Sequence, residues 1–363
     1  WWSNPFAALG LRRGLTTMRQ MALVGFLQAQ NCTNLASSWR HPESRLDFTT
    51  PEFYQEIARV LEAGKFDIGF FDDRLSMPDR YGNDHHHTLE HGIRCVKLDP
   101  IVTLTMMAAA TKYLGLGSTA STTYYEPFHV ARSFQTLDHM SGGRSAWNIV
   151  TSLNDGEAAN MGRDEVMDHD LRYDRADEFV EVVLGHWNSW RDDTLILDQK
   201  TGRFGDGDKV RRLDYRGQFL HSRGPFTVPR SRQGHPVLMQ AGSSGRGKRF
   251  SARWAELVFV AYHDIKTGKQ DYADFKALVQ TMGRDPDQVK VATLCYPICA
   301  ATKSEAEDKA ALIEKLPLEI DALSLLSEAL NFDFASKGMD EPFTDEEMAS
   351  MQGLSLIHIS EPT

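Results

Sequence analysis

The stretch LGLGSTASTTYYEPFHVARSFQTLDHMSGGRSAWNIVTS, residues 114–152, decides the fold of this chain. Residues 114–122 are small and suited to a strand, and Pro127 then fits the first turn of a helix whose apolar residues recur at helical spacing. The Ser-Gly-Gly of residues 141–143 ends that helix, and residues 146–150 form a second short apolar run. Two strands joined by one amphipathic helix make a βαβ unit, which predicts parallel strands and a right-handed crossover.

Both predicted strands end in small polar residues. The first strand ends in Thr119, Ser121 and Thr122, and the second in Asn148, Thr151 and Ser152. In α/β folds with parallel strands, the carboxyl ends of the strands face the ligand, and hydroxyl and amide groups suit a polar, largely uncharged, planar one. Such residues can also lie in ordinary loops, where they hydrogen-bond the free backbone groups at the ends of strands. Two adjacent strands that end in this way favour a binding site.

Composition and charge exclude several classes of protein. The 363 residues suffice for one α/β barrel or two smaller domains. The net charge of -10 argues against nucleic acid as a main partner, since phosphate neutralisation needs a basic face. No apolar run reaches the roughly 20 residues of a membrane span. The four cysteines show no disulfide framework, which fits a reducing cytoplasm, and we expect Cys295 and Cys299 to be buried thiols in a strand-like run.

Both ends of the chain look foreign to the fold. Residues 1–17 precede Met18 and lack the long apolar core of a secretion signal, so we expect them to be a non-native leader. The last ten residues, LSLIHISEPT at 354–363, resemble a translated sequencing-library adapter. We therefore expect a single domain over residues 18–353, taken from a natural protein that continues beyond it.

Strands and helices alternate along the rest of the chain. Strands are predicted at residues 21–30, 66–71, 114–122, 146–150, 236–242, 256–262 and 289–300, and a last helical segment at 304–330. The charged, Gly-rich residues 188–235 predict an excursion from the barrel with a small β-hairpin layer around residues 213–226. This alternation favours an α/β fold of the TIM type, a (β/α)8 barrel that lacks its last strand. An open doubly wound sheet is the runner-up, weakened by the lack of a GxGxxG motif after the first strand.

Two further features could bind an anion. His169 and Tyr173 are four residues apart, so they share one face of the first turn of a predicted helix. Ser243 and Ser244 open the run SSGRGKR, in which small residues offer free backbone N–H groups at a helix start. A phosphate cradle and an ordinary helix cap with surface charges both fit this second run.

A polar loop carries His85, His86, His87 and His91. A metal site is one interpretation, but three consecutive imidazoles cannot all point in one direction. A solvated loop or a lid that faces the substrate is therefore favoured. Arg40, in the loop after the first strand, could line a site or cap the barrel.

The motifs FFDDR, LGLGSTAST, YYEPFHVARSFQTLDHMSGGRSAWNIVTS, HDLRYDRADEF and PVLMQAGSSGRG, in this order, resemble the bacterial-luciferase-like FMN-dependent monooxygenases. Within that family the chain is similar to the group of nitrilotriacetate monooxygenase component A and dibenzothiophene sulfone monooxygenase. The resemblance covers residues 18–353. It implies a luciferase-like TIM barrel that is truncated here before its last strand.

The resemblance also implies a function. A separate NAD(P)H-dependent flavin reductase would supply reduced FMN (FMNH2), and O2 would form a C4a-peroxyflavin that oxygenates a small organic substrate, often with cleavage of a C–N or C–S bond. The side chains would bind the flavin and exclude water, and none has to act as a nucleophile or a metal ligand. A homo-oligomer is expected for the full-length protein. Flavin contacts would fall on Asp73, Thr119, Asn148, His169, Tyr173, Ser243 and Ser244. The candidates for contact with the substrate or for stabilising the peroxide are Arg40, His85, His86, His87 and His91.

Three alternatives stay open. A metal-dependent barrel hydrolase would use the histidines, although the first strand ends in Gln-Asn-Cys at residues 30–32 and not in an HxH motif. A deazaflavin-dependent oxidoreductase of the same superfamily and a flavin-storage barrel are the others. Metal analysis, a titration of FMN against the deazaflavin, and oxygen-dependent product formation would separate them.

The expected lack of the last strand predicts low stability. An unclosed barrel leaves two strand edges unpaired and part of its core open. We therefore expect an early thermal melt for this chain, compared with a version extended to the length of the family. A cooperative melt of the shorter chain at high temperature would contradict this expectation.

Overall fold

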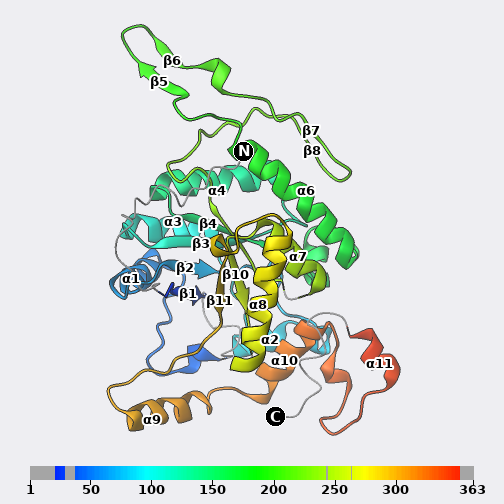
Figure 1. The fold of residues 1–363 in the computed structure, drawn as a ribbon. Coiled ribbons are helices and arrows are strands. Elements are labelled where there is room, and N and C mark those ends of the chain that lie inside the picture. The colour runs from blue at the N-terminus through cyan, green and yellow to red at the C-terminus, as the bar shows by residue number, and fades with distance from the viewer. Residues whose placement is uncertain (1–20, 29–36, 243, 263, 352–363) are drawn as a thin grey trace.

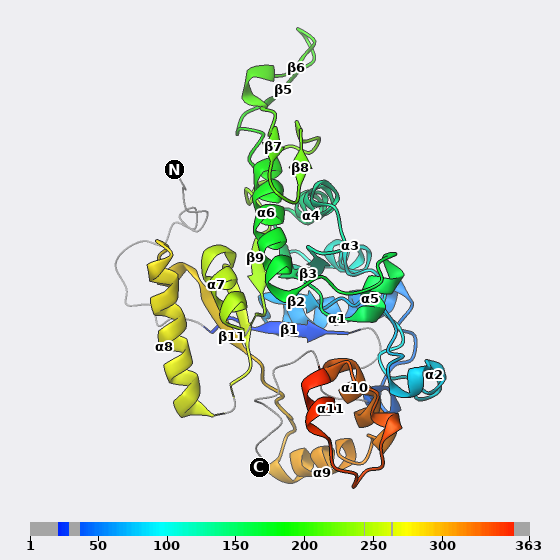
Figure 2. The ribbon, with the colours of Figure 1, turned by 90° about the vertical axis from the view of Figure 1, so that its right-hand side faces the viewer.

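The computed structural model describes residues 21–28, 37–242, 244–262 and 264–351. Seven strands form one parallel sheet in the order β1-β2-β3-β4-β9-β10-β11, which curls into a nearly closed barrel (Figures 1 and 2). The edge strands of this sheet are β1 and β11. The predicted TIM-type barrel is thereby confirmed, and the described residues form seven of its strands. The strands are β1 (Val24–Leu27), β2 (Ile68–Phe71), β3 (Gly115–Ser121), β4 (Ser145–Val150), β9 (Val237–Gln240), β10 (Leu257–Val260) and β11 (Lys290–Thr293).

Helices that follow successive strands cover the outside of the barrel, namely α1, α3, α4, α6, α7 and α8 (Figure 1). The shorter helices α2 and α5 lie in the loops that follow β2 and β4, and α9, α10 and α11 follow β11. The helices are α1 (Pro51–Ala63), α2 (His86–His91), α3 (Pro100–Ala110), α4 (Pro127–Ser141), α5 (Asp155–Asn160), α6 (His169–Trp187), α7 (Gly245–Trp254), α8 (Ile265–Thr281), α9 (Lys303–Ile313), α10 (Glu319–Leu330) and α11 (Asp345–Ser350).

The βαβ unit predicted over residues 114–152 is present as β3, α4 and β4. Helix α4 begins at Pro127 and ends at Ser141, and the capping Gly142 has a φ of 74°, the left-handed conformation that glycine adopts without strain. The two strands pair in parallel with Thr119 opposite Asn148. The polar ends of both strands therefore lie side by side.

Two apolar clusters hold this unit in place. Between the sheet and helices α4 and α6, Trp147 is fully buried against Phe134 and Phe179, and its indole Nε1 donates to the carbonyl of Ala120 at 3.1 Å. Inside the barrel, Phe70 has a ring-centroid distance of 5.4 Å from Phe26 on β1 and of 4.8 Å from Phe259 on β10. The barrel is thus filled by side chains, as expected for a small parallel barrel.

Residues 188–235 leave the barrel as two hairpins, which project from it in Figure 1. One pairs β5 (Leu195–Asp198) with β6 (Arg203–Gly205), and the other pairs β7 (Tyr215–Arg216) with β8 (His221–Ser222). The second hairpin was predicted around residues 213–226. Glu178 of α6 anchors it, because this carboxylate accepts backbone N–H groups of residues 218–220 at 2.7, 2.9 and 3.0 Å.

Two predictions for the last third of the chain are wrong. The strand expected over residues 289–300 ends at Thr293, and Cys295 and Cys299 are exposed, not buried. The strand ends where its partner ends, because Thr293 pairs with Val260, the last residue of β10, and Pro297 further on offers no N–H group to a ladder. The helix expected over residues 304–330 is divided into α9 and α10 before and after Pro317, since proline disrupts a helix interior.

Some predictions fall on parts of the chain outside the described residues. These are the leader at residues 1–17, the tail at 354–363 and the end of the first predicted strand at residues 29–30. Among the helices that the structure describes, none combines the length and the apolar character needed to cross a membrane.

Trp147→Ala is expected to lower the free energy of unfolding by about 3–5 kcal/mol, because it removes a large, fully buried side chain and leaves a cavity. Chemical denaturation followed by circular dichroism measures this change. The control is Tyr113→Ala, since Tyr113 is 84% exposed and its truncation should cost less than about 0.5 kcal/mol. Equal, small losses for the two variants would contradict the assigned core.

Candidate functional site

A relay of hydrogen bonds crosses the carboxyl ends of three neighbouring strands. Asn148 and Thr119 are both buried, at 4% exposure. The amide Nδ2 of Asn148 donates to Thr119 Oγ1 at 2.9 Å, and Thr119 Oγ1 donates to the carbonyl of Phe71 at 3.0 Å. The threonine hydroxyl has one proton, which it donates to the carbonyl of Phe71, so toward Asn148 it can only accept a hydrogen bond. The amide of Asn148 must therefore turn its NH2 group toward Thr119, which fixes its orientation.

This relay leaves one buried acceptor without a partner. Asn148 Oδ1 accepts no hydrogen bond from any residue that the structure describes. A buried carbonyl oxygen without a donor is costly, and in native proteins such groups nearly always find one. The end of β4 therefore presents a buried acceptor that an N–H group of a ligand on the strand ends would suit.

The first turns of α6 and α7 meet at a second corner. Ser244 caps α7, and its Oγ accepts from the N–H of Gly247 at 3.0 Å and lies 3.5 Å from His169 Nε2. The rings of His169 and Tyr173 lie 5.2 Å apart. A Cβ on Gly247 would lie 2.7 Å from the Tyr173 hydroxyl, so only glycine permits this close approach. Hydroxyl, imidazole and helix N–H groups together suit a phosphate.

The structure groups the residues predicted to contact a flavin as follows. Thr119 and Asn148 are hydrogen-bonded, and His169, Tyr173 and Ser244 share the corner between α6 and α7. Both groups, and Asp73, lie at the carboxyl ends of β2, β3, β4 and β9. These are neighbouring strands in the sheet. Ser243 lies outside the described residues, and flavin contact stays a prediction for all seven.

Asp73 follows the end of β2. Burial raises the pKa of its carboxyl to about 7, against the opposing effects of a hydrogen bond from the Arg74 N–H and of the charge on Lys97. Lys97 itself is bound to Asp72, with a distance of 2.5 Å between Nζ and Oδ1. Asp73 is therefore the carboxyl at the strand ends that can exchange a proton near neutral pH.

Arg40 is engaged within the protein. Its guanidinium pairs with the buried Asp321 of α10 at 2.6 Å and donates to the carbonyls of Leu316 and His91 at 3.1 and 3.0 Å. These contacts explain its position without a ligand, since they tie the loop after β1 to α10. Contact of Arg40 or His91 with the substrate stays a prediction.

The other histidines lie on α2 and the turn before it. His87 packs edge-on against Tyr81 with ring centroids 5.2 Å apart, and burial lowers the pKa of its imidazole. His85 and His86 are exposed and stack at 4.9 Å. Asp84, His85 and His86 bring potential ligand atoms within 4.8 Å of one another, but Asp84 already binds His86 Nδ1 at 2.6 Å on this exposed turn. The prediction that no metal binds here is untested.

Sequence reasoning missed Gln240, the last residue of β9. Its side chain is 4% exposed, and its Oε1 accepts from the N–H of Gly242 at 2.6 Å and from the hydroxyl of Ser251. Gln240 therefore shapes the loop that leads to Ser244. The available signal was a polar residue at the end of an apolar strand, the same signal that identified Asn148.

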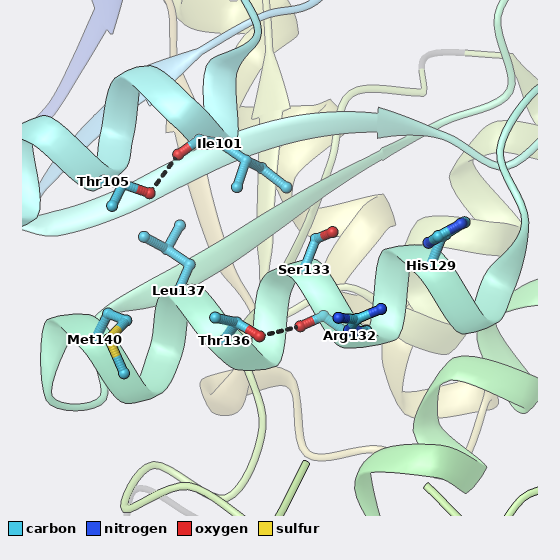
Figure 3. A pocket seen from close by; sticks show the side chains of 8 residues that line it. All are labelled: Ile101, Thr105, His129, Arg132, Ser133, Thr136, Leu137 and Met140. Carbon is cyan, nitrogen blue, oxygen red and sulfur yellow. Dashed lines mark hydrogen bonds between the residues drawn. The ribbon is translucent and has the colours of Figure 1, made fainter. Parts of the chain in front are cut away.

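A groove of about 290 Å³ lies elsewhere, on the outer face of the barrel between α3 and α4 (Figure 3). The hydroxyls of Thr105 and Thr136 in it donate to carbonyls of their own helices, both at 2.7 Å. None of the lining residues is at a strand end, so this groove is not the candidate site. It is lined by Ile101, Thr105, His129, Arg132, Ser133, Thr136, Leu137 and Met140.

Comparison with known proteins relates this geometry to a family. The profile of the luciferase-like monooxygenases matches residues 31–354. Dibenzothiophene-sulfone monooxygenase from Rhodococcus erythropolis is 45% identical over 336 residues, which are 91% of this chain and 73% of that enzyme. Nitrilotriacetate monooxygenase component A from Aminobacter aminovorans is 36% identical over 85% of this chain and 69% of its own. A crystal structure of riboflavin lyase with modified FMN and riboflavin has a TM-score of 0.84 at 31% identity, covering 89% of this chain and 73% of that one.

Asp73→Asn is expected to raise the melting temperature more at pH 8 than at pH 5. The folded chain holds the Asp73 proton up to about pH 7, whereas the unfolded chain releases it near the ordinary pKa of 3.8. The unfolded state thus binds fewer protons between these pH values, and this group destabilises the fold as the pH rises through them. Thermal melts at both pH values test this, with the exposed Asp164→Asn as the control. Equal shifts at the two pH values for Asp73→Asn would contradict the buried carboxyl.

Proposed function

We propose, from the premise that this chain belongs to the luciferase-like monooxygenase family, that it is the oxygenase component of an FMNH2-dependent two-component system. The match to the family covers most of the chain, so the predicted resemblance and the predicted monooxygenase function are confirmed. The choice of FMN, the partner and the substrate are the proposed part. The main support for the proposal is that Asn148 Oδ1 is buried, has a fixed orientation and has no hydrogen-bond donor among the described residues.

The residues present fit a reduced flavin mononucleotide. Its planar ring carries N–H groups that can donate to Asn148 Oδ1, and its single phosphate fits the corner of Ser244, Tyr173 and the N–H groups of α7. Riboflavin lyase, a structural neighbour at 31% identity, was solved with a modified FMN. When bound, the reduced flavin supplies the electrons and the reaction with O2. A deazaflavin is the alternative cofactor within the superfamily.

The protein's own residues then have simple tasks. The relay from Asn148 through Thr119 to the carbonyl of Phe71 orients the ring, because neither side chain can rotate without losing a hydrogen bond. Tyr173 and Ser244 hold the phosphate. Burial of these strand ends excludes water from the reacting part of the ring, which is the contribution that a flavin oxygenase needs from its protein.

The relatives guide the proposals for substrate and partner. Over the aligned residues, the relative that is named for dibenzothiophene sulfone is 45% identical to this chain, and the one that is named for nitrilotriacetate is 36% identical. We therefore favour an organosulfur substrate and C–S bond cleavage over C–N cleavage. The name "component A" of the second relative supports a separate partner, which we take to be an NAD(P)H-dependent flavin reductase. Location in the cytoplasm and homo-oligomerisation stay predictions, and no observation favours the metal-dependent hydrolase.

Reconstitution tests this function. The chain is combined with a flavin reductase, NADH, FMN and O2, and products are measured from a panel that includes dibenzothiophene sulfone and nitrilotriacetate. We expect oxygen-dependent product from an organosulfur compound, with no product when FMN is replaced by the deazaflavin. Turnover that needs an added metal but neither flavin nor O2 would contradict the proposal.

Asn148→Leu is expected to weaken the binding of reduced FMN about tenfold, the usual effect of losing one hydrogen bond to a ligand. Anaerobic titration measures this affinity. The melting temperature should not fall, because the variant also removes a buried oxygen without a partner. Asn160→Leu is the control for the loss of an amide, since Asn160 is exposed on α5 and its Nδ2 donates to the carbonyl of Leu75 at 2.8 Å, outside the relay. Unchanged affinity in Asn148→Leu would remove this residue from the flavin site.

A further inference from the structure

Helix α10 buries its polar face and exposes apolar residues. Its buried residues are Asp321, Ser324, Ser327, Glu328 and Leu330, whereas Leu326 is 39% exposed. Helices of globular proteins normally bury an apolar stripe and expose the polar one. The surface on which α10 packs must therefore be polar itself.

That surface is the carboxyl end of the barrel. Asp321 pairs with Arg40 from the loop after β1, and Glu328 pairs with Arg74 from the loop after β2 at 3.1 Å. Glu328 also accepts from the amide of Asn154, from the loop after β4, at 3.0 Å. Figure 2 shows α10 on the same side of the barrel as α2, against which it packs. Helix α10 thus covers the strand ends that carry the candidate flavin site.

Two buried donors under this helix have no partner among the described residues. Ser324 is 1% exposed, and its hydroxyl makes no hydrogen bond within the part of the chain that the structure describes. The same holds for Nη1 of Arg74, while the other terminal nitrogen of this guanidinium, Nη2, binds Glu328. Ser324 lies one turn before Glu328 on the same face of α10, and Glu328 binds Arg74, so both donors belong to the side of α10 that faces the loop after β2.

We infer that Arg74 and Ser324 bind the oxygen of the substrate, and that this oxygen belongs to a neutral, strongly dipolar group such as a sulfone. Both side chains offer N–H or O–H donors, so the matching group is an acceptor. Glu328 already balances the charge of Arg74, so a full negative charge on the ligand would lack a counter-ion. The inference rests on the proposed function, because it places the substrate between α10 and the flavin on the strand ends.

Arg74 also has the position that this role needs. It follows Asp73 directly and lies three residues after Phe71, whose carbonyl ends the relay from Asn148. The group that fixes the flavin ring and the group that binds the substrate oxygen therefore share one strand end. Such an arrangement would set the distance between substrate and ring through β2.

The decisive variant is Ser324→Ala. Dissociation constants of dibenzothiophene sulfone and nitrilotriacetate are measured by anaerobic calorimetry on the full chain loaded with reduced FMN. We expect the sulfone to bind wild type more tightly than nitrilotriacetate does, and Ser324→Ala to weaken the sulfone about tenfold. The affinity for reduced FMN and the melting temperature should not change, because the lost hydroxyl has no partner in the fold.

Ser327→Ala is the matched control. Ser327 is on the same buried stripe, but its hydroxyl already accepts from the N–H of Phe334 at 3.2 Å. This variant should lower the melting temperature and leave the affinity for the sulfone unchanged. If the polar residues of α10 only stabilise the fold, Ser324→Ala and Ser327→Ala should lower the melting temperature similarly, and neither should change the affinity for the sulfone.

A second variant, Arg74→Lys, keeps the charge beside Glu328 but loses the forked donors of the guanidinium. If Arg74 and Ser324 bind one oxygen, the double variant should weaken the sulfone by less than the product of the two single effects. Strictly multiplicative effects, no sulfone binding to wild type, or unchanged sulfone affinity in Ser324→Ala would each overturn the inference. Failure of wild type to bind reduced FMN would instead refute the proposed function, and the same samples report it separately.

Discussion

The parallel pairing of β3 and β4 in one register is the constraint on which the site depends. It places Thr119 opposite Asn148, and β2 on the other side of β3 places the carbonyl of Phe71 within reach of Thr119. A shift of one residue would turn these side chains to the other face of the sheet. Burial of Trp147 of β4 against Phe134 of α4 opposes such a shift, because the indole ring would then have to leave the core.

The sequence predicted local structure well and distant pairing poorly. The βαβ unit, the helix that begins at His169 and the second hairpin follow from periodicity, caps and turns, which are local signals. The pairing of Arg40 with Asp321 joins residues 281 positions apart, and one sequence without relatives carries no signal for it. Similarly, the sequence could not predict that α10 buries its polar face, since the spacing of polar and apolar residues does not say which face is buried. The exposed Cys295 shows the converse error, because an apolar run was taken as buried.

The two sides of the site have different physical origins. Strand ends and helix N-termini form one side, where backbone geometry fixes the donors and acceptors and little depends on side-chain length. Helix α10 forms the other side, where long side chains such as Arg74 and Glu328 reach across and where buried charge has to be balanced. The first side suits a cofactor that many enzymes share. The second is free to vary with the substrate, because Arg74 comes from a loop and Glu328 from a helix outside the strands of the barrel.

The central claim is that the fixed carbonyl of Asn148 and the corner between α6 and α7 bind opposite ends of one flavin. A crystal structure of this chain grown with FMN tests it most directly. We expect a ring nitrogen within hydrogen-bond distance of Asn148 Oδ1, and the phosphate against Tyr173, Ser244 and the N–H groups of α7. Flavin density in another place, for example in the outer groove between α3 and α4, would contradict the assignment of this site.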